Sequence, residues 1–147
     1  MDGDRDMKKL VLMVGLSGLL AGCAPQVKPE PDPMSTIDFT KADYGESPSN
    51  YQIKIKEWLE SNLKDPDSAK VSQPSKPRKE VAFKNKQPIF GYTTCIKVNA
   101  KNSYGGYSGP QTYWFFFHKG EIVRAQNVNE YPGAMIFINH FVNCADG

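Results

Sequence analysis

Thiol and imidazole groups are well suited to metal binding and nucleophilic chemistry, and this chain of 147 residues carries three cysteines and two histidines. A structural zinc site draws four such ligands from closely spaced pairs. The cysteines form no C-x-x-C pair, and a pair of His140 with Cys144 is the one local combination. We therefore expect no metal and no cofactor, with His118 and His140 in structural roles.

Catalytic motifs lead to no assignment either. A serine nucleophile needs a base and an orienting group, and Ser103 with His118 lacks a local motif such as G-x-S-x-G. Acidic residues are frequent near Glu57 and Asp65, but nothing selects a pair for glycoside cleavage. The Walker phosphate-loop pattern is absent. We predict no catalytic residue, which favours a protein that is not an enzyme.

The segment 99–110 (NAKNSYGGYSGP) is the best candidate for a binding site. Tyrosines on a glycine-rich loop offer flat apolar faces with hydroxyl groups, which bind peptides, sugars and proteins at a low entropic cost. A second interpretation has equal weight, namely a long hairpin connection whose tyrosines fold back over the core. The candidate binding residues are Lys101, Asn102, Tyr104, Gly105, Gly106 and Tyr107.

A helix over residues 49–64 is the first element expected to position this loop. Ser49 and Gln52 fit a capping box, and Pro66 would end the helix. One apolar stripe recurs at helical spacing, and we expect it to pack in the core. The stripe consists of Tyr51, Ile55, Trp58, Leu59 and Leu63.

Strands follow the helix. The segment 90–98 alternates apolar and smaller or polar residues with a period of two, and 112–118 (TYWFFFH) is apolar on both faces, which is typical of a central strand. Lys119 and Gly120 predict a two-residue hairpin turn. The predicted strands cover residues 81–84, 90–98, 112–118 and 121–128, with a turn over 85–88.

The segment 131–143 is compatible with two structures. Pro132 suits the first turn of a helix, and apolar residues follow it at helical spacing, whereas the β-branched and aromatic residues from Ile136 onward suit a strand. We favour the helix. The expected fold class is α+β in one domain over 49–147, with an N-terminal helix, an antiparallel meander of three or four strands and a C-terminal helix or strand.

The residues before and after the predicted helix are polar and rich in proline. Residues 24–48 should form a tether, from which Phe39 and Tyr44 could dock onto the domain. The basic residues near 76–79 fit a solvated loop better than a phosphate site. The net charge of +2 argues against a nucleic-acid binder.

The N-terminus carries an export pattern. Lys8 and Lys9 precede an apolar run over 10–20, which is too short to span a bilayer and fits the core of a signal peptide. Met7 is the more natural start, so residues 1–6 would reflect an upstream start. The run ends in Leu20-Ala21-Gly22-Cys23, which resembles the lipobox of bacterial lipoproteins.

This resemblance implies cleavage before Cys23 and a diacylglycerol on its sulfur, so that residues 1–22 are removed and the mature protein is anchored to a membrane. Ala24, which stands where an aspartate would favour inner-membrane retention, implies outer-membrane sorting facing the periplasm. The phrases LKDPDSA (63–69) and NAKNSYGGYSG (99–109) resemble those of small proteobacterial lipoproteins and secreted proteins. This second resemblance covers about 43–128 and implies no activity.

With Cys23 acylated, Cys95 and Cys144 remain in a compartment that permits disulfides, and the simplest expectation is that they pair. Two buried free thiols are the alternative. The leading hypothesis is a membrane-anchored, non-enzymatic binding or structural module of the envelope, with an envelope protein or peptidoglycan as partner. The alternatives are a hydrolase acting on peptidoglycan and an inhibitor or immunity-type lipoprotein.

Overall fold

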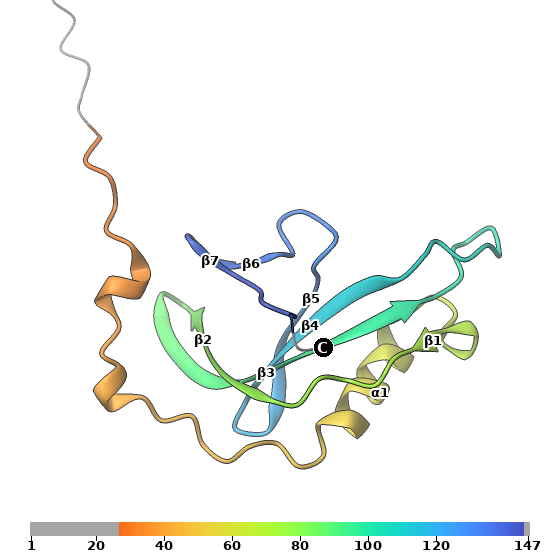
Figure 1. The fold of residues 1–147 in the computed structure, drawn as a ribbon, viewed down its shortest axis with the longest axis horizontal. Coiled ribbons are helices and arrows are strands. Elements are labelled where there is room, and N and C mark those ends of the chain that lie inside the picture. Colours follow the sequence, from red (N-terminus) through yellow and green to blue (C-terminus); the bar gives the residue numbers. More distant parts are fainter. Residues whose placement is uncertain (1–26, 146–147) are drawn as a thin grey trace, which may run out of the picture. The chain divides into compact units, whose positions relative to one another are not determined.

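A computed structural model describes residues 27–145, and residues 31–145 belong to one compact unit. Cys23 and the predicted signal segment lie outside the described residues. The fold is α+β, as predicted, with an antiparallel sheet, one α-helix and a C-terminal hairpin (Figure 1). The elements are η1 (Pro33–Thr36), η2 (Phe39–Lys41), α1 (Tyr51–Asn62), η3 (Pro66–Ser68), β1 (Lys70–Val71), β2 (Arg78–Lys84), β3 (Gln87–Asn99), β4 (Gln111–His118), β5 (Glu121–Asn127), β6 (Met135–Phe137) and β7 (His140–Phe141).

Helix α1 is shorter than the sequence predicts, and the predicted capping box is wrong. Asn50 is the N-cap residue, and no side chain caps the first turn. The last turn is closed by the Leu63 backbone N–H, which donates to the Leu59 carbonyl at 2.9 Å, and by the Asn62 amide, which donates to the Trp58 carbonyl at 2.8 Å. These bonds satisfy carbonyls that a helix end otherwise leaves open.

Strand β3 organises the sheet. One edge of β3 pairs with β4, which in turn pairs with β5, and the other edge pairs with both β1 and β2. In β2, Arg78 lies opposite Thr93, while in β1 Lys70 lies opposite Asn99. Strands β1 and β2 therefore act as one interrupted partner that runs along the whole of β3.

Two serines maintain contact with β3 across the interruption at residues 72–77, where Pro74 and Pro77 have no backbone N–H to donate. The Ser72 and Ser75 backbone N–H groups donate to the carbonyls of Lys97 and Cys95 at 2.9 and 2.8 Å. Their hydroxyls accept from the backbone N–H groups of the same two partners at 3.0 and 2.9 Å. Serine hydroxyls thus replace carbonyls of the ladder.

Two tight turns close the hairpins of the sheet. Lys119 and Gly120, with φ angles of 51° and 79°, form the predicted two-residue turn between β4 and β5. Asn85 and Lys86 have φ angles of 52° and 64°, so the turn before β3 is also two residues long. The predicted turn over 85–88 is therefore too long, because Pro88 already pairs with Phe83.

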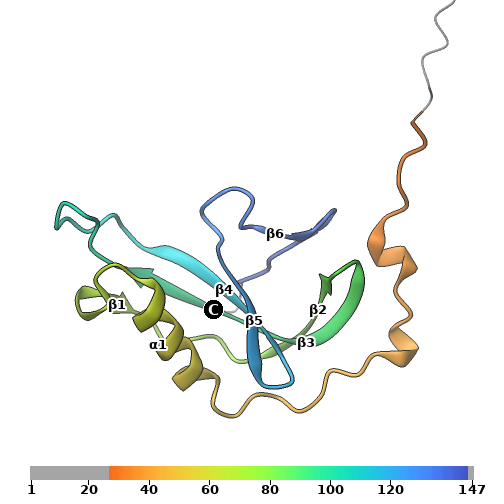
Figure 2. The same ribbon diagram turned by 180° about the vertical axis from the view of Figure 1, so that it is seen from behind.

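The sheet is buried on both faces, as the apolar pattern of β4 predicts. Helix α1 covers one face, where Ile55 and Leu59 pack against Phe115 and Phe117. Figure 2 shows α1 and the sheet in the view from behind Figure 1. On the other face of the sheet, Trp114 and Phe116 of β4 belong to a second core. This second core contains Ala82, Cys95, Trp114, Phe116 and Ile136.

The C-terminal segment is a hairpin, so the favoured helix over 131–143 is wrong and the strand alternative is confirmed. Met135 pairs with Phe141 and Phe137 with His140, and Asn139 turns the chain with φ 61°. Its apolar side chains fill the second core, where tertiary packing overrides the helical spacing.

A covalent bond and an arginine fix this hairpin to the sheet. The predicted disulfide between Cys95 and Cys144 is present and joins β3 to the chain end. The Arg124 guanidinium donates to the Ile136 and Met135 carbonyls at 2.6 and 3.1 Å. Burial lowers the pKa of Arg124 from its ordinary value.

The segment before α1 docks on the sheet near the start of β3. The rings of Phe39 and Tyr44 contact Phe90 edge-to-face, with centroids 6.0 and 5.3 Å apart. The Tyr92 hydroxyl donates to the Gly45 carbonyl at 3.2 Å. The docking predicted for the two aromatic residues is confirmed.

Candidate binding site

The predicted binding loop is a closed and well-bonded hairpin beyond the end of β3. Lys101 and Tyr107 form an isolated β-bridge, and the Asn102 side-chain oxygen accepts from the backbone N–H groups of Tyr104 and Gly106 at 3.0 and 3.1 Å. Gly105 adopts φ 81°, which glycine accepts without strain. These bonds fix the loop in one conformation.

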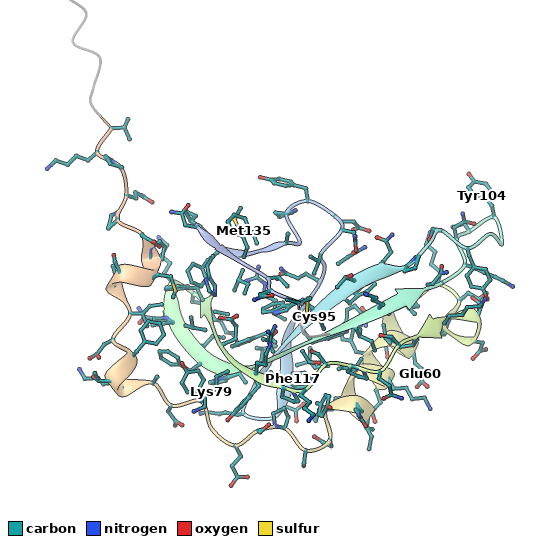
Figure 3. The ribbon with its side chains drawn as sticks, viewed as in Figure 1. Glu60, Lys79, Cys95, Tyr104, Phe117 and Met135 are labelled. Atoms are coloured by element: carbon teal, nitrogen blue, oxygen red, sulfur yellow. A yellow bond between two sulfur atoms is a disulfide. The ribbon has the colours of Figure 1, made fainter. Side chains whose placement is uncertain are left out.

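The two loop tyrosines lie differently, so neither interpretation of the sequence holds for both. Tyr104 is 97% exposed at the tip (Figure 3). Tyr107 bends back, but onto the chain after α1 rather than over the core, and its hydroxyl donates to the Ser68 carbonyl at 3.0 Å. Tyr104 is therefore available to a partner, whereas Tyr107 holds the loop in place.

Three lysines surround the loop. The Lys70 and Lys101 ammonium groups lie 4.6 and 5.7 Å from the centre of the Tyr107 ring. The Lys64 ammonium donates to the Ser103 hydroxyl at 2.8 Å. None of these lysines forms an ion pair with a carboxylate of residues 27–145. This end of the domain therefore presents ammonium groups without an ion-pair partner among the described residues, beside an exposed ring.

A pocket of about 420 Å³, the polar pocket, opens between the end of α1 and this end of the sheet. Its volume falls in the range of about 300–1,000 Å³ that is usual for small-molecule sites. The polar groups that line it come from the end of α1, the two arms of the loop, β4, the end of β5 and the chain after β5. They include Lys64, Lys101, Gln111, Tyr113, Asn127 and Glu130.

Hydrogen bonds within the polar pocket orient one carboxylate and leave other donors free. The Asn127 amide donates to Glu130 Oε1 at 2.8 Å and to Gln111 Oε1 at 3.3 Å. Burial, and then the Glu130 carboxylate, raises the pKa of the Tyr113 hydroxyl above its ordinary value. Neither the Tyr113 hydroxyl nor the Gln111 amide nitrogen donates to another group of the described chain.

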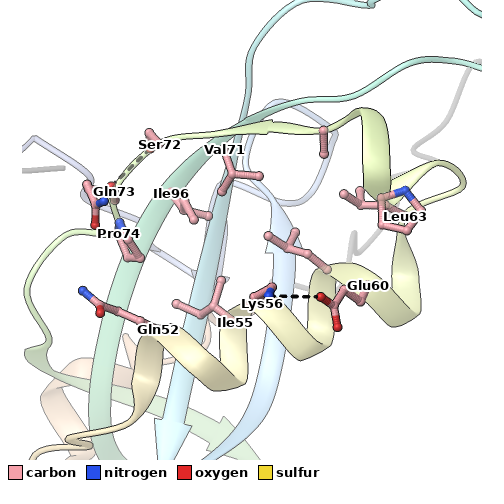
Figure 4. A pocket seen from close by; sticks show the side chains of 13 residues that line it. Gln52, Ile55, Lys56, Glu60, Leu63, Val71, Ser72, Gln73, Pro74 and Ile96 are labelled. Carbon is pink, nitrogen blue, oxygen red and sulfur yellow. Dashed lines mark hydrogen bonds and ion pairs between the residues drawn. The ribbon is translucent and has the colours of Figure 1, made fainter.

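An apolar groove of about 350 Å³ runs along the other side of α1, and Figure 4 shows its lining. Lys56 and Glu60, whose charged groups are 3.6 Å apart, lie on its helix side. Apolar side chains of α1, β1, β3 and the connecting chain supply much of the remaining wall. They include Ile55, Leu59, Leu63, Val71, Pro74 and Ile96.

The histidines have structural partners. His118 Nδ1 lies 2.8 Å from the Phe90 carbonyl oxygen, and His140 Nε2 lies 2.8 Å from Glu80 Oε1. Because Cys144 is in the disulfide, it forms no metal pair with His140. Within residues 27–145, no cluster of histidine, cysteine or acidic residues could hold a metal ion.

The other candidate groups are also separated or engaged. Ser103 lies in the loop before β4 and His118 at the far end of β4, so the two do not form a catalytic pair. Asp65 accepts from the Ser68 backbone N–H at 3.2 Å and caps η3. In the basic cluster, Arg78 donates to the Asn143 carbonyl and the Lys79 ammonium lies 5.0 Å from the Tyr44 ring centre.

Lys101 belongs to the predicted binding loop, but the other polar residues of the polar pocket were missed because no local motif joins them. In the sequence, Tyr113 has the pattern of an ordinary strand residue and Glu130 that of a turn residue, so neither indicates a site. Strand register alone brings Tyr113 opposite Asn127 and Gln111 opposite Val98. No sequence signal short of the sheet topology could have found this pocket.

Comparison with known proteins gives no relative, since no protein-family model, curated protein or solved structure matches the chain. Among the helices of residues 27–145, none combines the length and hydropathy that crossing a bilayer requires.

Proposed function

We propose that this protein is a lipid-anchored, non-enzymatic module of the bacterial envelope whose folded domain binds another envelope component. The sequence Leu20-Ala21-Gly22-Cys23, preceded by a charged and then an apolar segment, supports the lipid anchor. A diacylglycerol on Cys23, with an acyl chain on the amino group, would be sufficient for stable anchoring.

The observation that carries the proposal is that one domain separates the docked N-terminal segment from the exposed loop. Residues 39–45 pack against Phe90, near the start of β3, and the loop with Tyr104 follows its end at Asn99. The nine-residue step from Phe90 to Asn99 spans about 30 Å of extended strand. A chain anchored through its N-terminus would thus present Tyr104 at the end remote from the docked segment.

The anchor is tested by fractionation of cells that produce the full chain. Cys23→Ser removes the sulfur that would carry the lipid, so the protein should move from the membrane fraction to the soluble fraction. Retention of the Cys23→Ser protein in the membrane fraction would overturn the anchor.

The binding end is tested by cross-linking in intact envelopes. Tyr104→Ala removes a side chain that makes no core contact, and it should reduce recovery of the cross-linked partner without a change in the melting temperature. The matched control is Phe141→Ala, which removes a 58% exposed ring from the C-terminal hairpin. Equal recovery with both variants would contradict a role for the loop.

A further inference from the structure

We propose that the polar pocket binds the peptide of peptidoglycan, a short chain that carries free carboxylates, a free amino group and small apolar side chains. This inference deepens the proposed function, because it names the component that an envelope module would bind. It is carried by the arrangement of charge, hydrogen-bonding groups and apolar surface in one pocket.

The charges of the polar pocket are arranged for a ligand with charges of both signs. Lys101 follows β3 and Lys64 follows α1, and both ammonium groups lack a carboxylate partner in the described chain. Glu130 follows β5, two strands away from β3 in the sheet order. Neighbouring strands are about 4.8 Å apart, so Lys101 and Glu130 are attached to strands about 10 Å apart.

This separation suits a peptide better than a uniform polyanion. The lysines would pair with carboxylates of the ligand, and Glu130 would pair with its free amino group. The same Glu130 would repel a phosphate or a nucleic-acid backbone, since like charges at short range are unfavourable in a partly enclosed site. An uncharged glycan would leave both lysines without a partner.

Groups between the two charged sides match a peptide backbone. Gln111 and Tyr113 lie on β4, the strand between β3 and β5. The Tyr113 hydroxyl and the Gln111 amide nitrogen donate to no other group of the described chain and can donate to ligand carbonyls. The Tyr113 ring is held by Trp58, with centroids 5.9 Å apart, so its hydroxyl is positioned before a ligand arrives.

The lining of the pocket also includes apolar side chains. Leu63 and Ala100, both partly exposed, line it beside the polar groups. Methyl side chains, such as those of alanine residues in the peptidoglycan peptide, would remove this surface from water, at about 25 cal/mol for each Å² that is buried. The pocket thus offers a complementary group for each part of such a peptide.

Binding is tested with the full chain in detergent and the disaccharide tetrapeptide released from purified sacculi, by isothermal titration calorimetry. We expect saturable binding that weakens about tenfold in Lys101→Gln and about tenfold in Glu130→Gln, since hydrogen bonds to charged groups are the strong ones. Tyr113→Phe should weaken binding about fivefold, because it removes one neutral donor and keeps the ring.

Matched controls separate the pocket from general charge. Lys97→Gln and Glu60→Gln remove the same charges at exposed positions that do not line the polar pocket, and both should bind like the unaltered chain. Circular dichroism of every variant verifies that the fold is retained. Equal loss of affinity in the Lys97 and Lys101 variants would overturn the pocket as the site.

Three further probes decide the class of ligand. The tetrapeptide with amidated carboxylates, the disaccharide without peptide and vesicles of anionic phospholipid should all bind at least tenfold more weakly than the intact fragment. Equal binding of the bare disaccharide or of the vesicles would overturn the proposal in favour of a glycan or a membrane surface. Absence of binding by the intact fragment would overturn it while leaving the anchor and cross-linking results of the proposed function untouched.

Discussion

Reduction of the Cys95–Cys144 disulfide should destabilise the domain strongly, although it removes no side-chain atom from the core. The bond joins residues 49 apart in sequence. Cys95 is 1% exposed in the second core, and Cys144 lies against the same core. Reduction keeps both sulfur atoms, so the comparison between oxidised and reduced protein isolates the covalent link from the loss of side-chain volume.

The size of the effect follows from the length of the closed loop. In the chain-entropy description a loop of this length stabilises the folded state by about 4 kcal/mol at 25 °C, because it restricts the unfolded chain. Small domains have only about 5–15 kcal/mol of total stability. At about 2 kcal/mol per molar urea, the unfolding midpoint of the reduced protein should fall by about 2 M.

Urea unfolding followed by tryptophan fluorescence suits this measurement, because Trp58 packs against the core between α1 and the sheet, and Trp114 lies in the second core. Cys95→Ala with Cys144→Ala should be at least as unstable as the reduced protein, since it adds a small cavity. A midpoint for the reduced protein within about 0.5 M of the oxidised one would refute the reasoning.

Three other changes test separate parts of the structure. Gly91→Ala should cost about 3 kcal/mol or more in thermal unfolding, because its Cβ would lie 1.9 Å from the Phe117 backbone oxygen and backbone cannot move aside cheaply. Arg124→Lys should cost about 1–3 kcal/mol and accelerate hydrogen exchange in β6, because lysine cannot reproduce the forked bonds to two carbonyls. Burial raises the pKa of Tyr113, so the native state holds this proton more tightly than the unfolded chain does. The stability that this protonated hydroxyl contributes should be complete below about pH 10 and lost as the pH rises through the pKa of Tyr113 in the folded state. In urea titrations, Tyr113→Phe should therefore lose less unfolding free energy at alkaline pH than the unaltered chain.

The parts of the fold that were predictable are those in which a short stretch of sequence determines burial. The spacing of Ile55 and Leu59 identifies the buried face of α1, and the unbroken apolar run of β4 identifies a strand covered on both faces. Lys119 and Gly120 identify a turn because glycine accepts a positive φ. In each case the chemistry of neighbouring residues is sufficient.

Predictions failed where distant residues decide the structure. The C-terminal segment forms a hairpin because Ile136 and Phe137 fill a core that only the folded sheet creates. The sequence did not predict the polar pocket for the same reason, because its residues come from segments that only strand pairing brings together. The candidate binding loop was singled out because its tyrosines and glycines are contiguous, but the sequence could not tell that Tyr104 is exposed while Tyr107 bends back to Ser68.

The interruption between β1 and β2 changes which charged residues meet beside the loop. Residues 72–77 face residues 94–97, so this side of the ladder carries two extra residues. If residues 72–77 instead continued the register of β2, Lys70 would lie opposite Lys101, where like charges are destabilising. The observed register places Lys70 opposite Asn99 instead. Because the shift is two residues, each side chain keeps its face of the sheet, and the Lys70 ammonium still reaches the ring of Tyr107. The proline-rich interruption therefore allows three unpaired lysines to surround one end of the domain without two of them meeting in the ladder.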